Sequence, residues 1–166
     1  MWVFLASDCL FFGSFIATYL VYRNESIVGP YPNEILDIPL TSVSTFVLLM
    51  SSLAMVLALN YAQKDQLGLT RFWILAVAVL GAIFLGFQVF EFATFISEGL
   101  TIRSNLFGTT FFILTGFHGL HVAIGVLWLL GTAFAHFKGA LTSRSVEDLE
   151  MAGLYWHFVD IVWIII

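Results

Sequence analysis

The sequence has little charge, a single cysteine and no cluster of basic residues, and each absence excludes a class of protein. Only 10% of the residues are charged and 60% are hydrophobic, whereas roughly a quarter of the residues in a soluble domain are charged. A soluble domain is therefore excluded. Cys9 has no second cysteine to pair with, so an intrachain disulfide is excluded and a packed thiol is expected. A net charge of -5 without a basic patch excludes nucleic acid as a partner, because that binding depends on clustered cations.

What the sequence has instead is a series of long apolar runs separated by short polar breaks. Each run approaches or exceeds the roughly 20 residues that cross the hydrocarbon core as a helix. A β-barrel would show alternation of polar and apolar residues in segments of about ten, and these runs are continuously apolar. We therefore predict an all-α, polytopic membrane protein: a bundle of five transmembrane helices in one domain, residues 1–166. The predicted spans are residues 2–22, 39–62, 72–96, 106–137 and 151–166.

The distribution of cations predicts the orientation of these spans. Four cations lie in the second and fourth connections: Lys64, Arg71, Lys138 and Arg144. The first and third connections hold only Arg23 and Arg103. Because cytoplasmic loops carry the excess of Lys and Arg, the N-terminus is predicted to lie inside and the C-terminus outside. Met1 leads directly into an apolar span, so a cleaved signal peptide is not expected.

Six ionisable residues fall within the apolar runs, where a charged side chain is costly unless it is paired, neutralised or hydrated. They are Asp8, Glu91, His118, His121, His157 and Asp160. At about 1.5 Å per residue, Asp8 and His157 would lie roughly 10 Å from the inner edge, and His121 about 22 Å from the outer edge. These three residues share one level, and we predict that they form a buried polar network. An ion pair, a neutral hydrogen-bonded pair and a proton-exchanging site all fit this pattern, with a structural network as the first reading.

His118 and His121 are three residues apart and face roughly one side of a helix, a spacing that also occurs in metal sites. A zinc enzyme site usually has three protein ligands, and the HExxH motif is absent from the sequence. The neighbouring Gly116 and Gly119 favour another interpretation, because small residues permit close helix approach. We therefore predict two packing histidines and no metal.

Glu91 and Asp160 are the remaining acidic groups in the spans. Glu91 is expected to be hydrated or hydrogen-bonded to Gln88, Thr109 or Thr110. The sequence contains neither the set of axial ligands for haem nor the paired cysteines of a thiolate copper centre. No catalytic residue, cofactor-binding residue or metal ligand is therefore predicted in this chain.

Four segments, in order along nearly the whole chain, resemble cytochrome c oxidase subunit III. They are LASDCLFF at residues 5–12, QVFE at 88–91, LTGFHGLHVAIG at 114–125 and YWHFVDIVW at 155–163. The last two segments, at residues 114–125 and 155–163, are highly specific to this family. The order matches the last five helices of the seven-helix form of that family, and the chain is similar to the short five-helix form. The family has a buried, carbodiimide-reactive glutamate where this sequence has Asp8.

The resemblance implies an accessory subunit of a proton-pumping haem-copper terminal oxidase in aerobic respiration. It implies no redox centre here, with haem and copper in the partner subunits. The expected partners are the catalytic subunit I, subunit II and a small subunit IV, in a bacterial plasma membrane. The chain is expected to stabilise subunit I, to support its proton uptake and to help form an oxygen route through lipid. The longer form holds phospholipid in a cleft between its first two helices and the other five, and this chain lacks those two helices, so phospholipid is expected in such a cleft only where a neighbouring subunit supplies them.

The electron donor and two rival functions stay open at this stage. The SDC segment at residues 7–9 and the GP pair at 29–30 are similar to the related quinol oxidase subunit, whereas YWHFVD at 155–160 favours the cytochrome c type. A stand-alone proton-coupled transporter would also place acidic residues and histidines at mid-membrane, but it often shows internal repeats, and none is found. A membrane metalloenzyme is the third alternative, and metal analysis would distinguish it.

Overall fold

The computed structural model describes residues 1–22, 38–137 and 143–166, and within these ranges the chain is helical apart from short connections. Five helices are present in the described residues, and no strand. In order they are α1 (Trp2–Tyr22), α3 (Ile38–Gln63), α4 (Leu67–Ser97), α5 (Leu106–Phe137) and α6 (Ser143–Ile165). Helices are the expected outcome because they satisfy every interior backbone hydrogen bond within one segment, as lipid requires.

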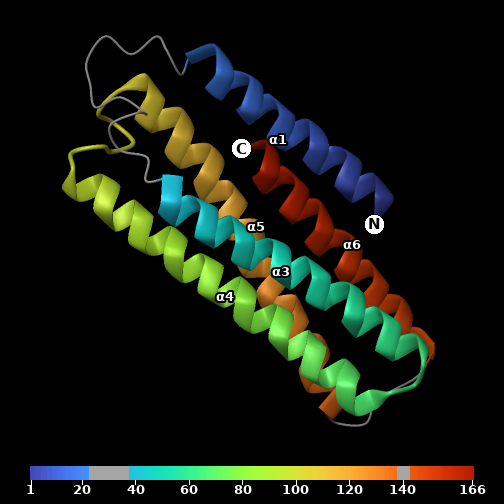
Figure 1. The fold of residues 1–166 in the computed structure, drawn as a ribbon. Coiled ribbons are helices and arrows are strands. Elements are labelled where there is room, and N and C mark those ends of the chain that lie inside the picture. The colour runs from blue at the N-terminus through green and yellow to red at the C-terminus, as the bar shows by residue number, and fades with distance from the viewer. Residues whose placement is uncertain (23–37, 138–142) are drawn as a thin grey trace.

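The helices run side by side along a common direction, as Figure 1 shows. Helices α3 and α4 pack along each other, α5 packs on α4, and α6 contacts both α3 and α5. The core lies where α3, α4, α5 and α6 meet, and its largest member is Trp156 of α6. Small residues such as Ala54, Ala58 and Ala78 line the α3 and α4 side of this core, which allows the two helices to approach closely.

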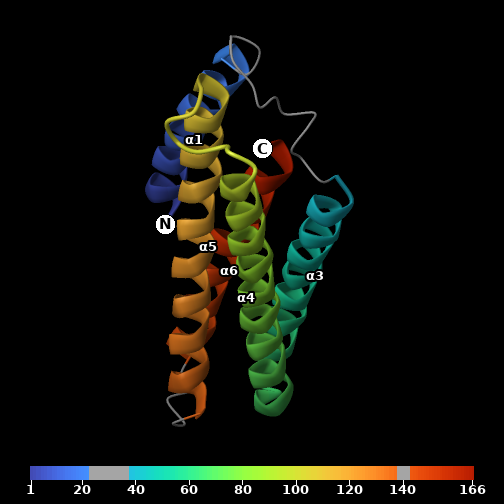
Figure 2. The same ribbon diagram turned by 90° about the vertical axis from the view of Figure 1, so that its left-hand side faces the viewer.

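Helix α1 lies at the edge of the bundle, where it packs mainly on α5 (Figure 1). Only three of its side chains are buried, namely Leu5, Asp8 and Phe12. Figure 2 shows that α3 diverges from α5 toward its first residues, with the end of α6 between them. Helices α3 and α5 are therefore farther apart at the end where α1 and α4 finish than at the opposite end.

The prediction of an all-α membrane protein is confirmed for the described residues. Helices α1, α3 and α4 are long and apolar enough to cross a membrane, and so is residue range 106–135 of α5. Helix α6 is not among these four candidates, and its crossing stays a prediction. It begins at Ser143, before the predicted start at residue 151, because a polar first stretch with the buried Leu149 continues the helix.

Candidate functional site

Asp8 of α1 and His121 of α5 form a close acid–base pair across the edge of the bundle. Asp8 Oδ2 lies 3.6 Å from His121 Nε2, and the two side chains are 12% and 14% exposed. His121 Nδ1 lies 2.7 Å from the carbonyl oxygen of Phe117. A carbonyl only accepts hydrogen bonds, so Nδ1 carries a proton and Nε2 faces the carboxyl group. At 3.6 Å the two groups are close enough for an ion pair but not for a hydrogen bond, and Asp8 Oδ2 has no hydrogen-bond partner among the described residues.

Helix α6 and aromatic rings enclose this pair. The hydroxyl of Tyr155 donates a hydrogen bond of 2.9 Å to the backbone carbonyl of His121. The ring of Phe12 meets the imidazole of His121 edge to face, with centroids 4.9 Å apart. The Asp8–His121 pair thus connects α1 to α5, and Tyr155 connects that point of α5 to α6.

His157 was predicted to share a network with Asp8 and His121, and the structure gives it another partner. Its Nδ1 lies 2.6 Å from the hydroxyl of Ser52 on α3. In the described part of the chain no hydrogen bond or ion pair joins His157 to Asp8 or His121. The reason is direction around the helix: two residues along α6 from Tyr155 is a rotation of about 200°, so His157 faces α3 when Tyr155 faces α5.

Asp160 lies one turn beyond His157 on the same side of α6 and is only 4% exposed. The hydroxyl of Ser52 interacts with its carboxyl group, but neither carboxyl oxygen meets hydrogen-bond geometry with a partner in the described residues. Ser52 therefore lies between His157 and Asp160. This polar contact between α3 and α6 is separate from the Asp8–His121 pair.

His118 is fully buried among aromatic rings. Its imidazole stacks on the indole of Trp163, with centroids 4.8 Å apart, and meets the ring of Phe84 edge to face at 5.8 Å. Its two nitrogens have no hydrogen-bond partner in the described residues. His118 and His121 therefore contact different helices despite their spacing. Within the described ranges, no group of three His, Cys, Asp or Glu side chains is placed to hold a metal ion.

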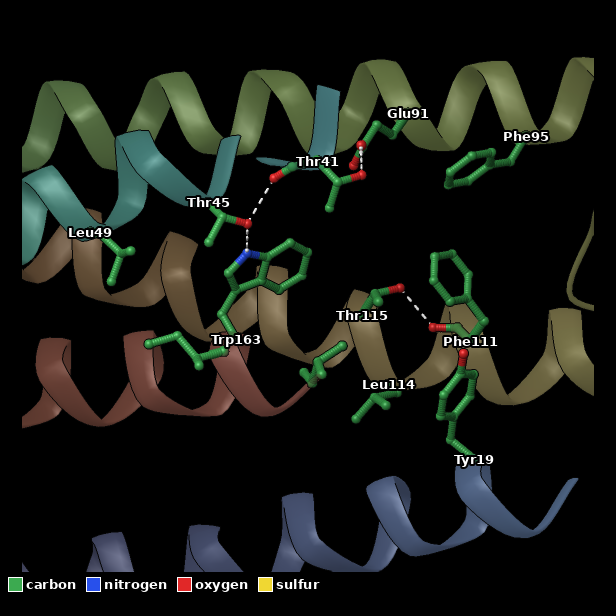
Figure 3. A pocket seen from close by; sticks show the side chains of 12 residues that line it. Tyr19, Thr41, Thr45, Leu49, Glu91, Phe95, Phe111, Leu114, Thr115 and Trp163 are labelled. Atoms are coloured by element: carbon green, nitrogen blue, oxygen red, sulfur yellow. Dashed lines mark hydrogen bonds between the residues drawn. The ribbon is translucent and has the colours of Figure 1, made fainter. Parts of the chain in front are cut away.

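Glu91 lies in the wall of a cavity of about 450 Å³ toward the end of the bundle where α3 and α5 begin (Figure 3). Its Oε1 accepts a hydrogen bond of 2.9 Å from the hydroxyl of Thr41 on α3. Thr45, one turn further along α3, accepts a hydrogen bond of 3.0 Å from Trp163 Nε1 on α6. The other walls are largely apolar and include Phe95, Phe111, Leu114 and Ile164. The cavity is thus a mainly apolar space with one carboxyl group at its side.

The structure gives Glu91 a partner, Thr41, that was not among the predicted ones, and hydration of Glu91 stays a prediction. The amide nitrogen of Gln88 donates to the carbonyl oxygen of Thr115 at 2.6 Å. The hydroxyls of Thr109 and Thr110 donate to backbone carbonyls near the start of α5. The threonine that donates to Glu91 comes from α3, because Glu91 lies on the side of α4 that faces α3.

The comparison with known families decides between the alternatives that the site geometry leaves open. Residues 1–166 match the family described as cytochrome c oxidase subunit III. The chain belongs to the cytochrome c oxidase subunit III family. The resemblance seen in the sequence is confirmed, and the buried polar groups lie in an oxidase accessory subunit.

Individual subunit III relatives match over almost the whole chain. The chain is 36% identical over 166 residues to the cytochrome c oxidase subunit 3 of Bacillus subtilis, covering 99% of this chain and 80% of that one. It is 35% identical over 166 residues to the probable quinol oxidase subunit 3 of Staphylococcus haemolyticus, covering 99% and 83%. It is 34% identical over 165 residues to the quinol oxidase subunit 3 of Bacillus subtilis, covering 99% and 81%.

Trp156 is a central residue of this subunit III that sequence reasoning missed. Its indole nitrogen donates to the hydroxyl of Ser51 on α3 at 2.9 Å. Its ring occupies space that only glycine leaves free on two other helices: a Cβ at Gly81 would lie 2.5 Å from the ring, and one at Gly125 would lie 2.8 Å from it. One indole therefore contacts α3, α4 and α5 at once. Gly81 and Gly125, each within an apolar helix, could have indicated a close contact in the sequence. A glycine alone does not show which side chain packs against it.

Gly119 allows a second close approach, and its substitution is expected to destabilise the protein. A Cβ there would lie 2.5 Å from Gln88 Oε1 and 2.9 Å from Nε2. Gly119→Ala should displace the amide and break its bond to the carbonyl of Thr115, which costs about 1–3 kcal/mol. The thermal midpoint of the purified protein should fall, while Gly116→Ala, whose Cβ would meet nothing within 4 Å, should leave it unchanged. Equal midpoints for the two variants would contradict this contact.

Proposed function

We propose that this chain is the accessory subunit III of a haem-copper terminal oxidase and that it contributes structure rather than redox chemistry. The observation that supports this most is the family match over residues 1–166. Haem and copper centres require ligands aimed at a shared cavity, and the described histidines are engaged separately with Asp8, Ser52 and an aromatic cluster. Haem and copper are therefore assigned to the partner subunits.

The proposed partners are the catalytic subunit I, subunit II and a small subunit IV. The chain would pack on subunit I in a bacterial plasma membrane, with its N-terminus inside and its C-terminus outside. The cation distribution supports this orientation, since Lys64 lies in the connection between α3 and α4 and Arg71 in the second turn of α4 beside it, whereas Arg103 alone lies between α4 and α5. In this position the chain would stabilise subunit I during turnover and support its proton uptake.

Within this function, the Asp8–His121 pair is proposed to fasten α1 to the rest of the subunit. Helix α1 has few buried side chains, and Asp8 is the polar one among them. The contact of its carboxyl group with Nε2 of His121, at 3.6 Å, joins α1 to α5. A helix held by so few groups depends strongly on each of them. The Ser52 contact with His157 and Asp160 is proposed to do the same between α3 and α6.

Selective removal of the chain from the purified oxidase tests this function. The reduced-minus-oxidised haem spectrum should stay the same, because the haem ligands lie in other subunits. The rate of activity loss during turnover should rise several-fold, and adding the chain back should restore it. Loss of the haem spectrum on removal, without dissociation of the catalytic subunit, would contradict the accessory role.

The proposal extends to the electron donor of the oxidase, which is either cytochrome c or a quinol. Relatives named for cytochrome c and for quinol match at 36% and 35% identity, so the same accessory role applies to either donor. The YWHFVD segment at residues 155–160 favours the cytochrome c type. We therefore expect the complex purified through this chain to oxidise reduced cytochrome c. Oxidation of quinol with no activity toward cytochrome c would assign it to the other branch.

A further inference from the structure

A second cavity, open to the outside of the bundle, lies between α4 and α5 and has a volume of about 560 Å³. Its apolar walls come from the two helices, with Phe92 and Ile96 on α4 and Phe112 and Gly116 on α5. Thr101 and Arg103, in the connection between these helices, line its remaining side. The space is therefore an apolar groove with a cation at one end, and we call it the α4–α5 groove.

The cation at that end has no ion-pair partner among the residues that the structure describes. Arg103 is exposed and makes no ion pair within the residues that the structure describes, although the acidic Glu98 lies in the same connection. A guanidinium binds a phosphate through two parallel hydrogen bonds, which makes it the side chain best suited to a phosphodiester. The hydroxyl of Thr101 lies beside it, within hydrogen-bond reach of the backbone nitrogen of Arg103 at 3.3 Å.

The groove runs along about two turns of α5. The connection folds back beside the start of this helix, since a Cβ at Gly108 would lie 2.6 Å from the carbonyl oxygen of Thr101 and the hydroxyl of Thr109 donates to the carbonyl oxygen of Ile102. From Gly108 to Gly116 the helix rises about 12 Å, which is somewhat less than half of the roughly 30 Å of hydrocarbon in a bilayer. The cation lies near the start of α5, and the apolar groove continues from it through most of one leaflet.

A glycine keeps the inner end of the groove open. A Cβ at Gly116 would meet no atom within 4 Å, so the space above it is empty of protein. In the same groove, the rings of Phe92 on α4 and Phe112 on α5 meet edge to face, with centroids 4.9 Å apart, and fill the space between the two helices. The floor is therefore smooth and apolar, as the methylene groups of an acyl chain require.

We propose that the α4–α5 groove binds one anionic phospholipid, with its phosphate on Arg103 and Thr101 and one acyl chain along Phe92 and Phe112 as far as Gly116. The walls and the cation all belong to this chain. The site therefore differs from the lipid cleft that the family resemblance implies, which requires the two further helices of the seven-helix form. Net negative charge on the head group is specified because the exposed guanidinium of Arg103 attracts it.

Native mass spectrometry of the complex purified through a tag on this chain tests the proposal with phosphatidylglycerol and phosphatidylcholine as probes. Gly116→Leu adds a side chain in the groove at a position where a Cβ meets nothing within 4 Å, and Gly131→Leu is its matched control, because a Cβ at Gly131 also meets nothing within 4 Å. Gly116→Leu should lower the retained phosphatidylglycerol about tenfold, since each buried methylene contributes to binding. Arg103→Gln should lower it about fivefold, and Lys64→Gln, in the other short connection, should leave it unchanged.

Three outcomes would overturn the proposal. The first is equal phosphatidylglycerol retention in Gly116→Leu and Gly131→Leu. The second is equal binding of phosphatidylcholine and phosphatidylglycerol by the unmodified complex. The third is loss of a partner subunit in Gly116→Leu, which would make the groove a protein interface. The same spectra report whether haem-bearing subunits accompany the chain, so a failure of the proposed function is read separately from a failure of the lipid site.

Discussion

Replacement of Trp156 by alanine is expected to lower the free energy of unfolding by about 3 kcal/mol, at the lower end of the range for such core truncations. The lower end applies because lipid is as apolar as the bundle core, so lost packing contributes and transfer from water does not. The packing lost is unusually broad, since the indole fits against Gly81 and Gly125 and donates to Ser51. The measurement is the unfolding midpoint of the purified protein in a denaturing detergent series.

Two comparisons make the Trp156 prediction specific. Trp128→Ala removes the same side chain from an exposed position on α5, where the indole is 36% exposed, and should cost much less. Gly81→Val should destabilise the native protein, because its Cβ would collide with the indole. In the Trp156→Ala background the collision with the indole is gone and only Val126, 2.8 Å from the added Cβ, must shift, so the two changes should be non-additive by about 0.5–3 kcal/mol. Simple additivity would show that Gly81 and Trp156 do not share this contact.

Asp8→Ala is expected to release α1 from α5 and to shorten the working life of the oxidase by about tenfold, without changing its haem spectrum. The change leaves Nε2 of His121 without the carboxyl group 3.6 Å away. A partly buried polar group that loses its partner costs about 1–3 kcal/mol, and about 1.4 kcal/mol corresponds to a factor of ten. The measurement is the rate of activity loss during turnover, together with the amount of this subunit retained after gel filtration.

Two further variants separate the possible roles of Asp8. Asp8→Glu keeps a carboxyl group, adds one methylene and gives the residue that the family resemblance implies at this position. The 3.6 Å separation leaves room for the longer side chain to approach His121. It should retain the normal working life. Asp8→Asn keeps a hydrogen-bonding group but no exchangeable acidic proton, so a normal working life in this variant would assign Asp8 a purely fastening role. A normal working life in Asp8→Ala itself would contradict the proposed function of the pair.

Helix positions could be predicted from the sequence because lipid imposes length and continuous apolarity on each span. The predicted bounds of the first and fourth spans, residues 2–22 and 106–137, match α1 and α5. The start of α6 could not be predicted in this way, because its first turns lie outside the apolar run. There the sequence pattern reports only hydropathy, whereas the helix continues through Glu147 and Glu150 with Leu149 buried in the core and with Glu150 Oε1 accepting a hydrogen bond of 3.2 Å from Gln63 Nε2 on α3.

The contacts between polar side chains could be predicted only where the depth of each residue in the membrane was enough to identify its partner. Depth placed Asp8 and His121 at one level, and they are in contact. It placed His157 at the same level, but the direction of a side chain around its helix also decides which helix it meets. The partner of Glu91 was missed for a related reason: Thr41 is distant in sequence, and only the packing of α3 on α4 brings it close.

Gentle purification of the tagged chain from its native membrane, followed by a reduced-minus-oxidised spectrum and mass spectrometry of its partners, tests the subunit assignment most directly. A stoichiometric haem signal and a catalytic subunit with many transmembrane helices should accompany the chain, and metal analysis should find haem iron and copper only when those partners are present. A colourless chain that arrives alone and moves protons with a solute in liposomes would contradict the accessory function and identify a free-standing transporter.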